Sequence, residues 1–182
     1  MRFLIVSHVV HKKSKDQFWA YGPYVKEMNL WFNYVDQVTV LAPLNLNVEP
    51  DPIDLPYIHP SLSISPVPEF DLLTWSSRIK TTLKIPGIFF KTLREMALAD
   101  HIHLRCPGNM GLVGSIAQCF FPRKTKTAKY AGNWDPKSTQ PFTYKLQRIL
   151  LENELLSRNI QVLVYGNWKS KSKNIKSFFT AT

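Results

Sequence analysis

The sequence predicts an open α/β fold, with a mainly parallel sheet and helices on both of its faces. Seven short apolar runs of strand character alternate along the chain with amphipathic segments of helical period. That order favours parallel strands joined by right-handed crossovers. A length of 182 residues suits one domain with a sizeable core, so residues 1–182 are expected to form a single domain.

The expected strands are placed by the apolar runs, the first of which directly follows Met1. They lie at about 2–7, 37–41, 62–67, 101–105, 127–131, 161–165 and 175–180. The first helix is expected from Pro23 to Asn33, because proline is favoured in a first turn. Further helices fit residues 86–98, 109–121 and 142–156. Seven prolines between positions 43 and 68 predict a long extended connection with one short strand.

The composition indicates a basic protein that meets anionic partners. Lys and Arg number 23 against 13 Asp and Glu, a net charge of +10. Phosphates, acidic glycans, anionic lipid headgroups and nucleic acid are the partner classes that such a field favours. No apolar run approaches the roughly 18 residues that span a bilayer, and the chain enters its first strand without a leader. A cytoplasmic location is therefore expected, with Cys106 and Cys119 reduced.

The loop after the first strand carries no nucleotide-binding motif. A dinucleotide fold would need Gly-x-Gly-x-x-Gly there and a P-loop would need Gly-Lys-Ser/Thr, because glycine lets backbone amides approach phosphate. A phospho-receiver domain would need clustered acids, and Ser7-His8 supplies none. Gly22-Pro23 places a hinge before a helix N-terminus, where a small anion could sit. An ordinary turn is the alternative for this dipeptide.

The segment from Arg105 to Asn109 follows the fourth strand. Asn109 is expected to cap a helix over Met110–Phe121, and Arg105 beside that N-terminus would grip a phosphate or carboxylate. The alternative is that Asn109 only caps and Arg105 pairs with an acid. His101 and His103 share one strand face without a third ligand nearby, so no metal site is expected.

A second polar loop follows the fifth strand, from Tyr130 to Pro136. Asn133 and Asp135 suit sugar hydroxyls, and Trp134 between them suits the apolar face of a sugar ring. The same residues could equally form a turn. The segment Tyr165–Trp168 repeats the pattern after the sixth strand.

The stretch from Arg78 to Arg94 holds five cations and no acid, interleaved with apolar and aromatic residues. This mixture suits a helix lying at an anionic membrane surface. We therefore expect the anionic inner face of the membrane as a partner. A packed amphipathic helix with a solvated basic face is the alternative.

In the order and spacing of these segments, the chain resembles the amino-terminal, acceptor-side domain of GT-B glycosyltransferases of the group 1 type (glycosyltransferase family 4). The resemblance covers nearly the whole chain and implies a Rossmann-like fold, one half of the GT-B architecture. The segments that carry it are Arg2–Ser7, Tyr21–Pro23, Asp100–Arg105, Lys129–Pro136, Gln161–Tyr165 and Ser177–Thr182.

The resemblance implies an enzyme that transfers a sugar from a nucleotide-sugar donor to a sugar or lipid-linked acceptor, with retention and without metal or cofactor, in surface glycan or polysaccharide assembly. The donor and the catalytic glutamates would lie in a second, C-terminal domain that this chain is expected to lack. No catalytic residue is therefore assigned, and the chain alone is expected to be inactive. The substrate-binding residues would be Gly22, Arg105, Asn109, Asn133 and Asp135.

The chain also departs from the family pattern. Gly22 is all that remains of a glycine-rich turn, and Arg105 and Asn133 stand where histidines are common. An alternative function is a non-catalytic basic α/β module that binds polyanions or nucleic acid. Its base-stacking aromatics would be expected on an exposed sheet, whereas the tryptophans follow strand ends, so nucleic acid is not the expected partner.

Overall fold

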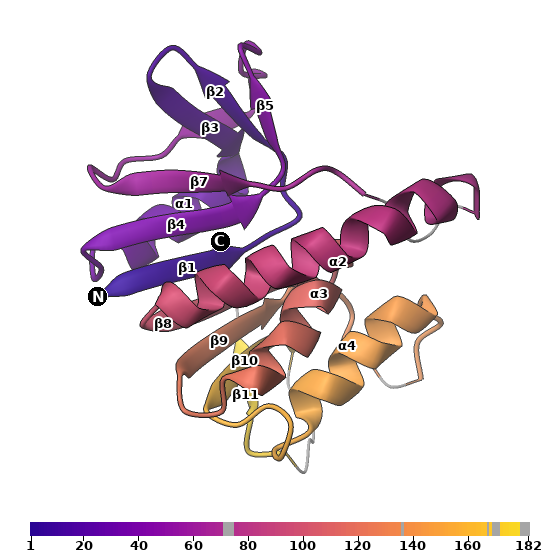
Figure 1. Ribbon diagram of the computed structural model, residues 1–182. Helices are drawn as coiled ribbons and strands as arrows, with labels where there is room; N and C mark the ends of the chain where they lie inside the picture. The colour runs from indigo at the N-terminus through magenta and orange to yellow at the C-terminus, as the bar shows by residue number, and fades with distance from the viewer. Residues whose placement is uncertain (71–74, 136, 167, 169–171, 179–182) are drawn as a thin grey trace.

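A seven-stranded parallel sheet forms the centre of the computed structural model and confirms the predicted α/β class (Figure 1). The structure describes residues 1–70, 75–135, 137–166, 168 and 172–178, with side chains of the second helix from Lys84 onward. The strand order is β11-β10-β9-β8-β1-β4-β7. The strands lie where the apolar runs predict them: β1 (Arg2–Val6), β4 (Gln37–Ala42), β7 (Leu62–Pro66), β8 (His101–Cys106), β9 (Thr125–Tyr130), β10 (Ile160–Tyr165) and β11 (Ile175–Phe178).

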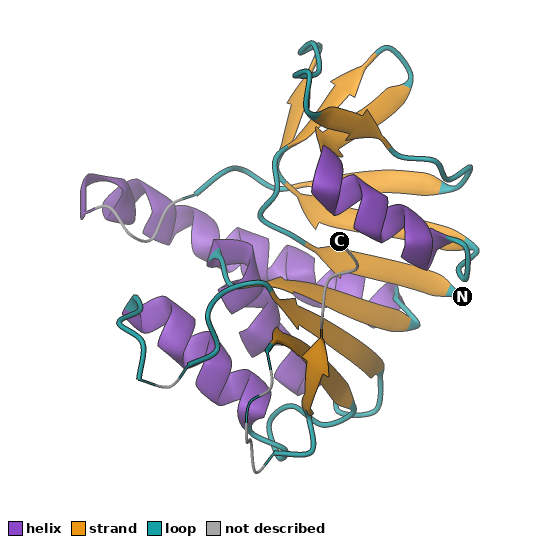
Figure 2. Ribbon diagram, turned by 180° about the vertical axis from the view of Figure 1, so that it is seen from behind, coloured by secondary structure: helices purple, strands orange, loops and turns teal. Residues whose placement is uncertain are grey.

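Helices cover both faces of the sheet, as predicted, but unequally. On one face lies α1 (Gly22–Phe32), and on the other lie α2 (Trp75–Leu98), α3 (Asn109–Ala117) and α4 (Phe142–Glu152) (Figures 1 and 2). A short 3-10 turn, η1 (Gln118–Phe120), extends α3. The expected start of the second helix at residue 86 is wrong, because Pro86 lies inside α2.

A second, four-stranded sheet stands at the carboxyl ends of β1 and β4 (Figure 1). Its order is β5-β2-β3-β6, formed by β5 (Leu44–Leu46), β2 (His11–Ser14), β3 (Gln17–Tyr21) and β6 (Asp54–Pro56). The expectation of one short strand between residues 43 and 68 is therefore wrong, and the β2–β3 hairpin was not predicted. The strand β2 contains Lys12-Lys13-Ser14, which shows no apolar alternation.

The core is divided into two layers by the main sheet. Alternate residues of β1 face opposite sides: Phe3 and Ile5 pack under α1, whereas Leu4 and Val6 belong to the cluster under α2 and α3. All four are at most 2% exposed, as expected for a strand buried on both faces.

The strand order reverses between β1 and β8. The chain leaves β1 toward β4 and β7, and leaves β8 toward β9, β10 and β11, on the opposite side. The connections after β1 and β8 therefore diverge and leave a crevice at the carboxyl ends of these two neighbouring strands. Ligands of open α/β sheets bind at such a switch point.

Candidate functional site

A pocket of about 210 Å³ lies at the switch point. The loops that follow β1, β4, β7 and β8 build it, and α4 adds one aromatic side chain. The lining residues are His8, Val10, Pro43, Glu69, Phe70, Gly108, Asn109, Met110 and Tyr144. We call this the switch-point pocket.

The N-terminus of α3 opens onto the switch-point pocket. Gly108 occupies the cap position, and no side chain caps the helix. Within the part of the chain that the structure describes, the backbone amides of Asn109, Met110 and Gly111 have no acceptor. Free amides at a helix start carry partial positive charge and can bind an anion.

Gly108 is held between two side chains at the edge of this pocket. A Cβ on Gly108 would lie 2.6 Å from His8 Nδ1, so only glycine lets the His8 ring approach. The Gly108 N–H donates to Oε1 of the fully buried Gln147 at 3.3 Å. Burial, followed by the charge of Arg105, lowers the pKa of His8, so its ring is neutral at pH 7. A neutral imidazole can donate to a phosphate oxygen without bringing a charge.

The remaining lining groups suit a ligand with hydroxyls and an apolar ring face. The Glu69 carboxylate is exposed and can accept hydrogen bonds from hydroxyls, but it would repel a second anion. Phe70 and Tyr144 supply ring surface. The pocket therefore matches a sugar phosphate: its amides suit the phosphate, its carboxylate suits the hydroxyls, and its rings suit the apolar face of the sugar.

Asn109 is the one predicted site residue that lines the switch-point pocket. The expectation that it caps α3 is wrong, because the cap position belongs to Gly108. The Asn109 side-chain amide instead donates to the Phe70 carbonyl at 2.8 Å. This bond fastens the loop after β7 to the start of α3, so Asn109 shapes the pocket wall.

Arg105 points away from the switch-point pocket, toward α1. Its guanidinium pairs with Glu27 at 2.8 Å and lies over the Tyr24 ring at 5.3 Å. Lys129, its neighbour in register on β9, pairs with the same carboxylate at 2.7 Å, and the Lys129 side chain is only 3% exposed. The pairing of Arg105 with an acid is the alternative stated for it above. Two cations share one carboxylate here.

Gly22 begins α1 and is buried beneath the segment that precedes β6. Its N–H donates to the Ile53 carbonyl at 3.0 Å, and a Cβ on Gly22 would lie 2.4 Å from that oxygen. The Gly22 amide, which was expected to approach a phosphate, is therefore already bonded to the Ile53 carbonyl. Glycine is required at this position by close backbone packing.

Asn133 and Asp135 form the turn that was stated as the alternative to a sugar site. Asn133 Oδ1 accepts from the Asp135 N–H at 2.9 Å, and Asp135 Oδ1 accepts from the Lys137 N–H at 2.9 Å. Trp134 is only 3% exposed and packs edge-on against Tyr130, so it offers no stacking face to a sugar. Neither Asn133 nor Asp135 lines the switch-point pocket.

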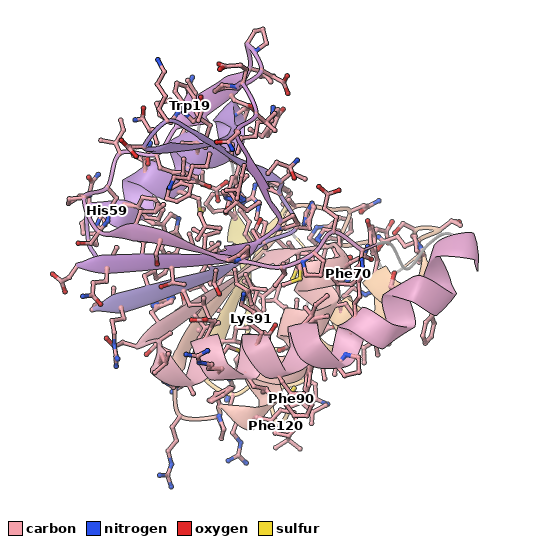
Figure 3. All side chains as sticks on the ribbon, turned by 45° about the horizontal axis from the view of Figure 1, so that its top comes forward. Trp19, His59, Phe70, Phe90, Lys91 and Phe120 are labelled. Atoms are coloured by element: carbon pink, nitrogen blue, oxygen red, sulfur yellow. The ribbon has the colours of Figure 1, made fainter. Side chains whose placement is uncertain are left out.

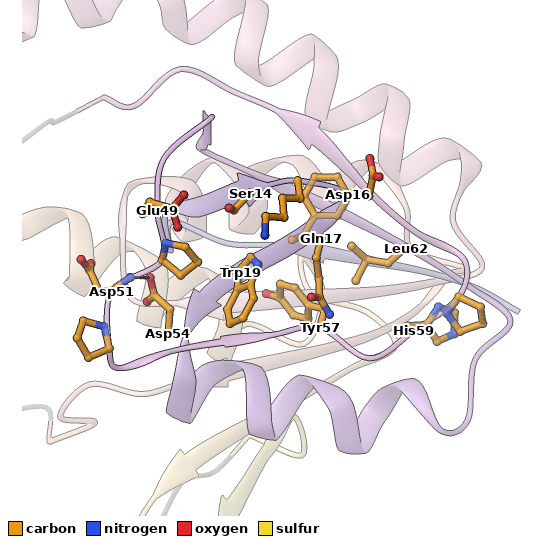
Figure 4. A pocket seen from close by; sticks show the side chains of 15 residues that line it. Ser14, Asp16, Gln17, Trp19, Glu49, Asp51, Asp54, Tyr57, His59 and Leu62 are labelled. Atoms are coloured by element: carbon orange, nitrogen blue, oxygen red, sulfur yellow. Dashed lines mark hydrogen bonds between the residues drawn. The ribbon is translucent and has the colours of Figure 1, made fainter.

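A larger groove of about 960 Å³ runs along the four-stranded sheet (Figure 4). The half-buried Trp19 lies in its wall, and four carboxylates line it: Asp16, Glu49, Asp51 and Asp54. Lys12 bridges Asp51 and Asp54 at 2.5 and 2.7 Å. Carboxylates beside an indole suit sugar hydroxyls, so this groove complements the switch-point pocket.

Among the pocket residues with polar or aromatic side chains, sequence reasoning named Asn109 and missed four: His8, Glu69, Phe70 and Tyr144. His8 and Glu69 follow the ends of β1 and β7, and a strand-end position was the available signal for both. Tyr144 belongs to α4, which follows β9 in the chain. Nothing in the local sequence of Tyr144 indicates that its ring reaches the pocket.

Among the described residues, no cluster of His, Cys, Asp and Glu could hold a metal ion. None of the helices in that same part of the chain is long and apolar enough to cross a membrane. A scan of protein-family models finds no match to the chain, and a search of curated proteins finds none either.

Proposed function

We propose that the chain is the acceptor-side domain of a retaining, metal-independent glycosyltransferase of surface glycan or polysaccharide assembly, with a nucleotide-sugar as donor. The observation that carries this proposal is the switch-point pocket, where uncapped α3 amides, Glu69 and two aromatic rings fit a sugar phosphate. The resemblance of the sequence to that family's N-terminal domain gives the reaction class. The groove beside Trp19 offers a separate place for an acceptor sugar.

In this proposal the chain binds and orients, and the donor-binding domain completes the chemistry. The α3 amides hold the phosphate that departs from the sugar, and the neutral His8 donates to it. Retention requires the acceptor hydroxyl to attack the face from which that phosphate leaves. A volume of about 210 Å³ is below the ~300–1,000 Å³ of sites that enclose a whole drug-sized ligand, so the pocket fits only part of the donor.

The first prediction concerns ligand binding to the isolated chain. Uridine diphosphate glucose, guanosine diphosphate mannose and glucose 1-phosphate are expected to bind with dissociation constants of about 1 mM or weaker. The amide signals of Asn109, Met110 and Gly111 should shift in ¹H–¹⁵N NMR titrations. Asn109→Asp should abolish these shifts, because a carboxylate at the first turn repels the phosphate and cannot donate to the Phe70 carbonyl.

The matched control is Asn45→Asp, the same charge change on exposed strand β5 outside the pocket. It should leave the titration unchanged. Micromolar binding of a nucleotide-sugar would contradict the assignment of the donor to another domain. Shifts that leave the start of α3 untouched would contradict the pocket.

The second prediction concerns membrane contact, which a lipid-linked acceptor would require. Phe90 and Phe120, labelled in Figure 3, are 69% and 65% exposed. The Phe89 ring contacts both of them. Lys84 and Arg94 are exposed on the same helix, whereas Lys91 donates to the Pro66 carbonyl and Arg78 and Lys80 lie outside the described side chains. These aromatics and cations support docking on an anionic surface.

Vesicle sedimentation should show binding that rises with anionic lipid and falls with salt. The double change Phe90→Ser and Phe120→Ser should reduce bound protein at least tenfold. Phe142→Ser, at a ring that is 77% exposed at the start of α4, is the matched control and should have no effect. Equal binding to neutral vesicles would argue against this surface.

A further inference from the structure

One face of the main sheet carries no helix over β9, β10 and β11, although on β9 the side chains of Thr127 and Lys129 are only 8% and 3% exposed. Figure 2 shows α1 across the other half of this face and no helix in front of these three strands. The helices α2, α3 and α4 all lie on the opposite face (Figure 1). Parallel sheets almost always carry helices on both faces, because their strands are apolar on both. The part of the chain that the structure describes therefore leaves exposed side chains over β10 and β11 that no helix covers.

The side chains of this open face grade from polar to apolar along the strands. At the amino ends, a hollow of about 540 Å³ is lined by His101, Thr125, Thr127, Gln161 and Lys176 among others. Toward the carboxyl ends stand Leu163, Tyr165 and Phe178, all partly exposed. An apolar strip beside a polar hollow matches an amphipathic partner.

The open face is positively charged. Strand alternation and register place 125, 127, 129, 161, 163, 165, 176 and 178 on it, and none of these residues is Asp or Glu. Lys129 is already paired with Glu27, but Lys176 and Lys173 are exposed at the hollow. The complementary charge on an occupant is negative.

The helix α1 continues this surface at its flank. Glu27 reaches Lys129 on β9, so that flank borders the open strands. Leu30 lies three residues later on the same flank and is 67% exposed. A helix laid beside α1 would cover Leu30 together with Leu163 and Tyr165.

We propose that this open face docks an acidic amphipathic helix of a partner polypeptide. The helix lies beside α1, buries an apolar stripe on Leu163, Tyr165 and Phe178, and directs carboxylates to Lys176 and the hollow. A second copy of this chain fits less well, because two such faces would place Lys176 against like charge. Single-stranded nucleic acid also fits less well: Lys129 Nζ lies over the Tyr165 and Phe178 rings at 5.4 and 4.6 Å, and those rings are tilted against each other.

The test uses the full chain and a designed 18-residue peptide with leucines at helical spacing and glutamates elsewhere. Its binding is followed by ¹H–¹⁵N NMR and fluorescence anisotropy. Shifts are expected over β9–β11 and the flank of α1, with a micromolar dissociation constant that weakens with salt. Lys176→Glu and Leu163→Glu should each weaken binding at least tenfold. Lys145→Glu, an exposed lysine on α4, is the control and should change it less than twofold.

Three outcomes would overturn the proposal. The first is peptide-induced shifts confined to another surface, or no binding. The second is equal binding of a peptide with lysines in place of the glutamates. The third is occupation of the face by something else: concentration-dependent dimerisation in light scattering that Leu163→Glu abolishes, or shifts on the same face with a 12-residue oligouridine. None of these outcomes would count against the proposed function, because the switch-point pocket lies elsewhere, at the carboxyl ends of β1 and β8.

Discussion

Replacing Glu27 by alanine is expected to lower the free energy of unfolding by about 3–5 kcal/mol. Glu27 is the carboxylate that both Arg105 and Lys129 contact, at 2.8 and 2.7 Å. Without it, the Lys129 ammonium would stay buried against Tyr165 and Phe178, with ring faces as its remaining charge-stabilising contacts. An unpaired buried charge costs far more than the pair contributes. Urea unfolding at pH 7 measures the change.

Three further variants separate the ion pair from other effects of this substitution. Glu49→Ala removes an exposed glutamate and should change stability by no more than about 0.5 kcal/mol. Glu27→Gln should lose less than Glu27→Ala, because its amide oxygen still accepts from Lys129. Adding Lys129→Met to Glu27→Ala should recover stability, since no charge is then stranded. A loss below about 1 kcal/mol for Glu27→Ala would mean that Lys129 finds water or another acceptor.

The fold is expected to lose stability as the pH falls below about 6.5, which is well above the pH range in which carboxylates titrate. Burial lowers the pKa of His103 to about 3 and that of His11 to about 4, from 6.5 in the unfolded chain. The unfolded state therefore binds more protons between these values, so stability is complete above about pH 6.5 and falls as the pH drops. At pH 5 each ring accounts for a loss of about 2 kcal/mol.

The surroundings of the two rings explain why they stay neutral. His103 is fully buried, its Nε2 has no partner among the described residues, and Arg105 and Lys129 lie close enough to oppose its charge. His11 Nε2 is hydrogen-bonded to the Tyr57 hydroxyl at 2.7 Å, and His11 Nδ1 is hydrogen-bonded to the Val9 carbonyl at 2.8 Å. No carboxylate among the described residues raises the pKa of either ring.

Urea unfolding at pH 8, 6.5 and 5 checks this dependence. His103→Asn should remove about half of the slope, and the double variant with His11→Asn most of it. The comparison is between slopes, so it stands even if the variants are less stable at pH 8. A stability that stays level from pH 7 to 5 in the parent chain would mean that both rings are protonated in the fold.

The framework was predictable from the sequence where a strand buried on both faces reads as a continuous apolar run. Arg2–Val6 is the clear case, whereas Ile160–Tyr165 is fully buried on one face only and Thr125–Tyr130 contains two lysines. The four-stranded sheet was not predictable in this way. Its β2 strand is polar, and it is held by pairing with β3 and β5 rather than by its own pattern.

The candidate site was predictable only in part. Strand-end position indicated Asn109, but the partner of Arg105 is Glu27, 78 residues away in the sequence, and no local pattern reveals such a pair. Trp134 appeared free to stack on a sugar, yet it is buried against Tyr130. Whether a polar strand-end residue serves a ligand or a turn depends on tertiary contacts that the sequence does not display.

The meeting of β1 and β8 at the centre of the sheet has a consequence for how the chain folds. Strands β1, β4 and β7 come from the first 66 residues, and β8 to β11 come from residues 101–178, so within each group neighbours in the sheet are also neighbours in the chain. Leu4 pairs with Ile102 across the seam between the groups. The largest loop-closure entropy therefore falls on this one strand pairing, and every other pairing in the main sheet closes a shorter loop.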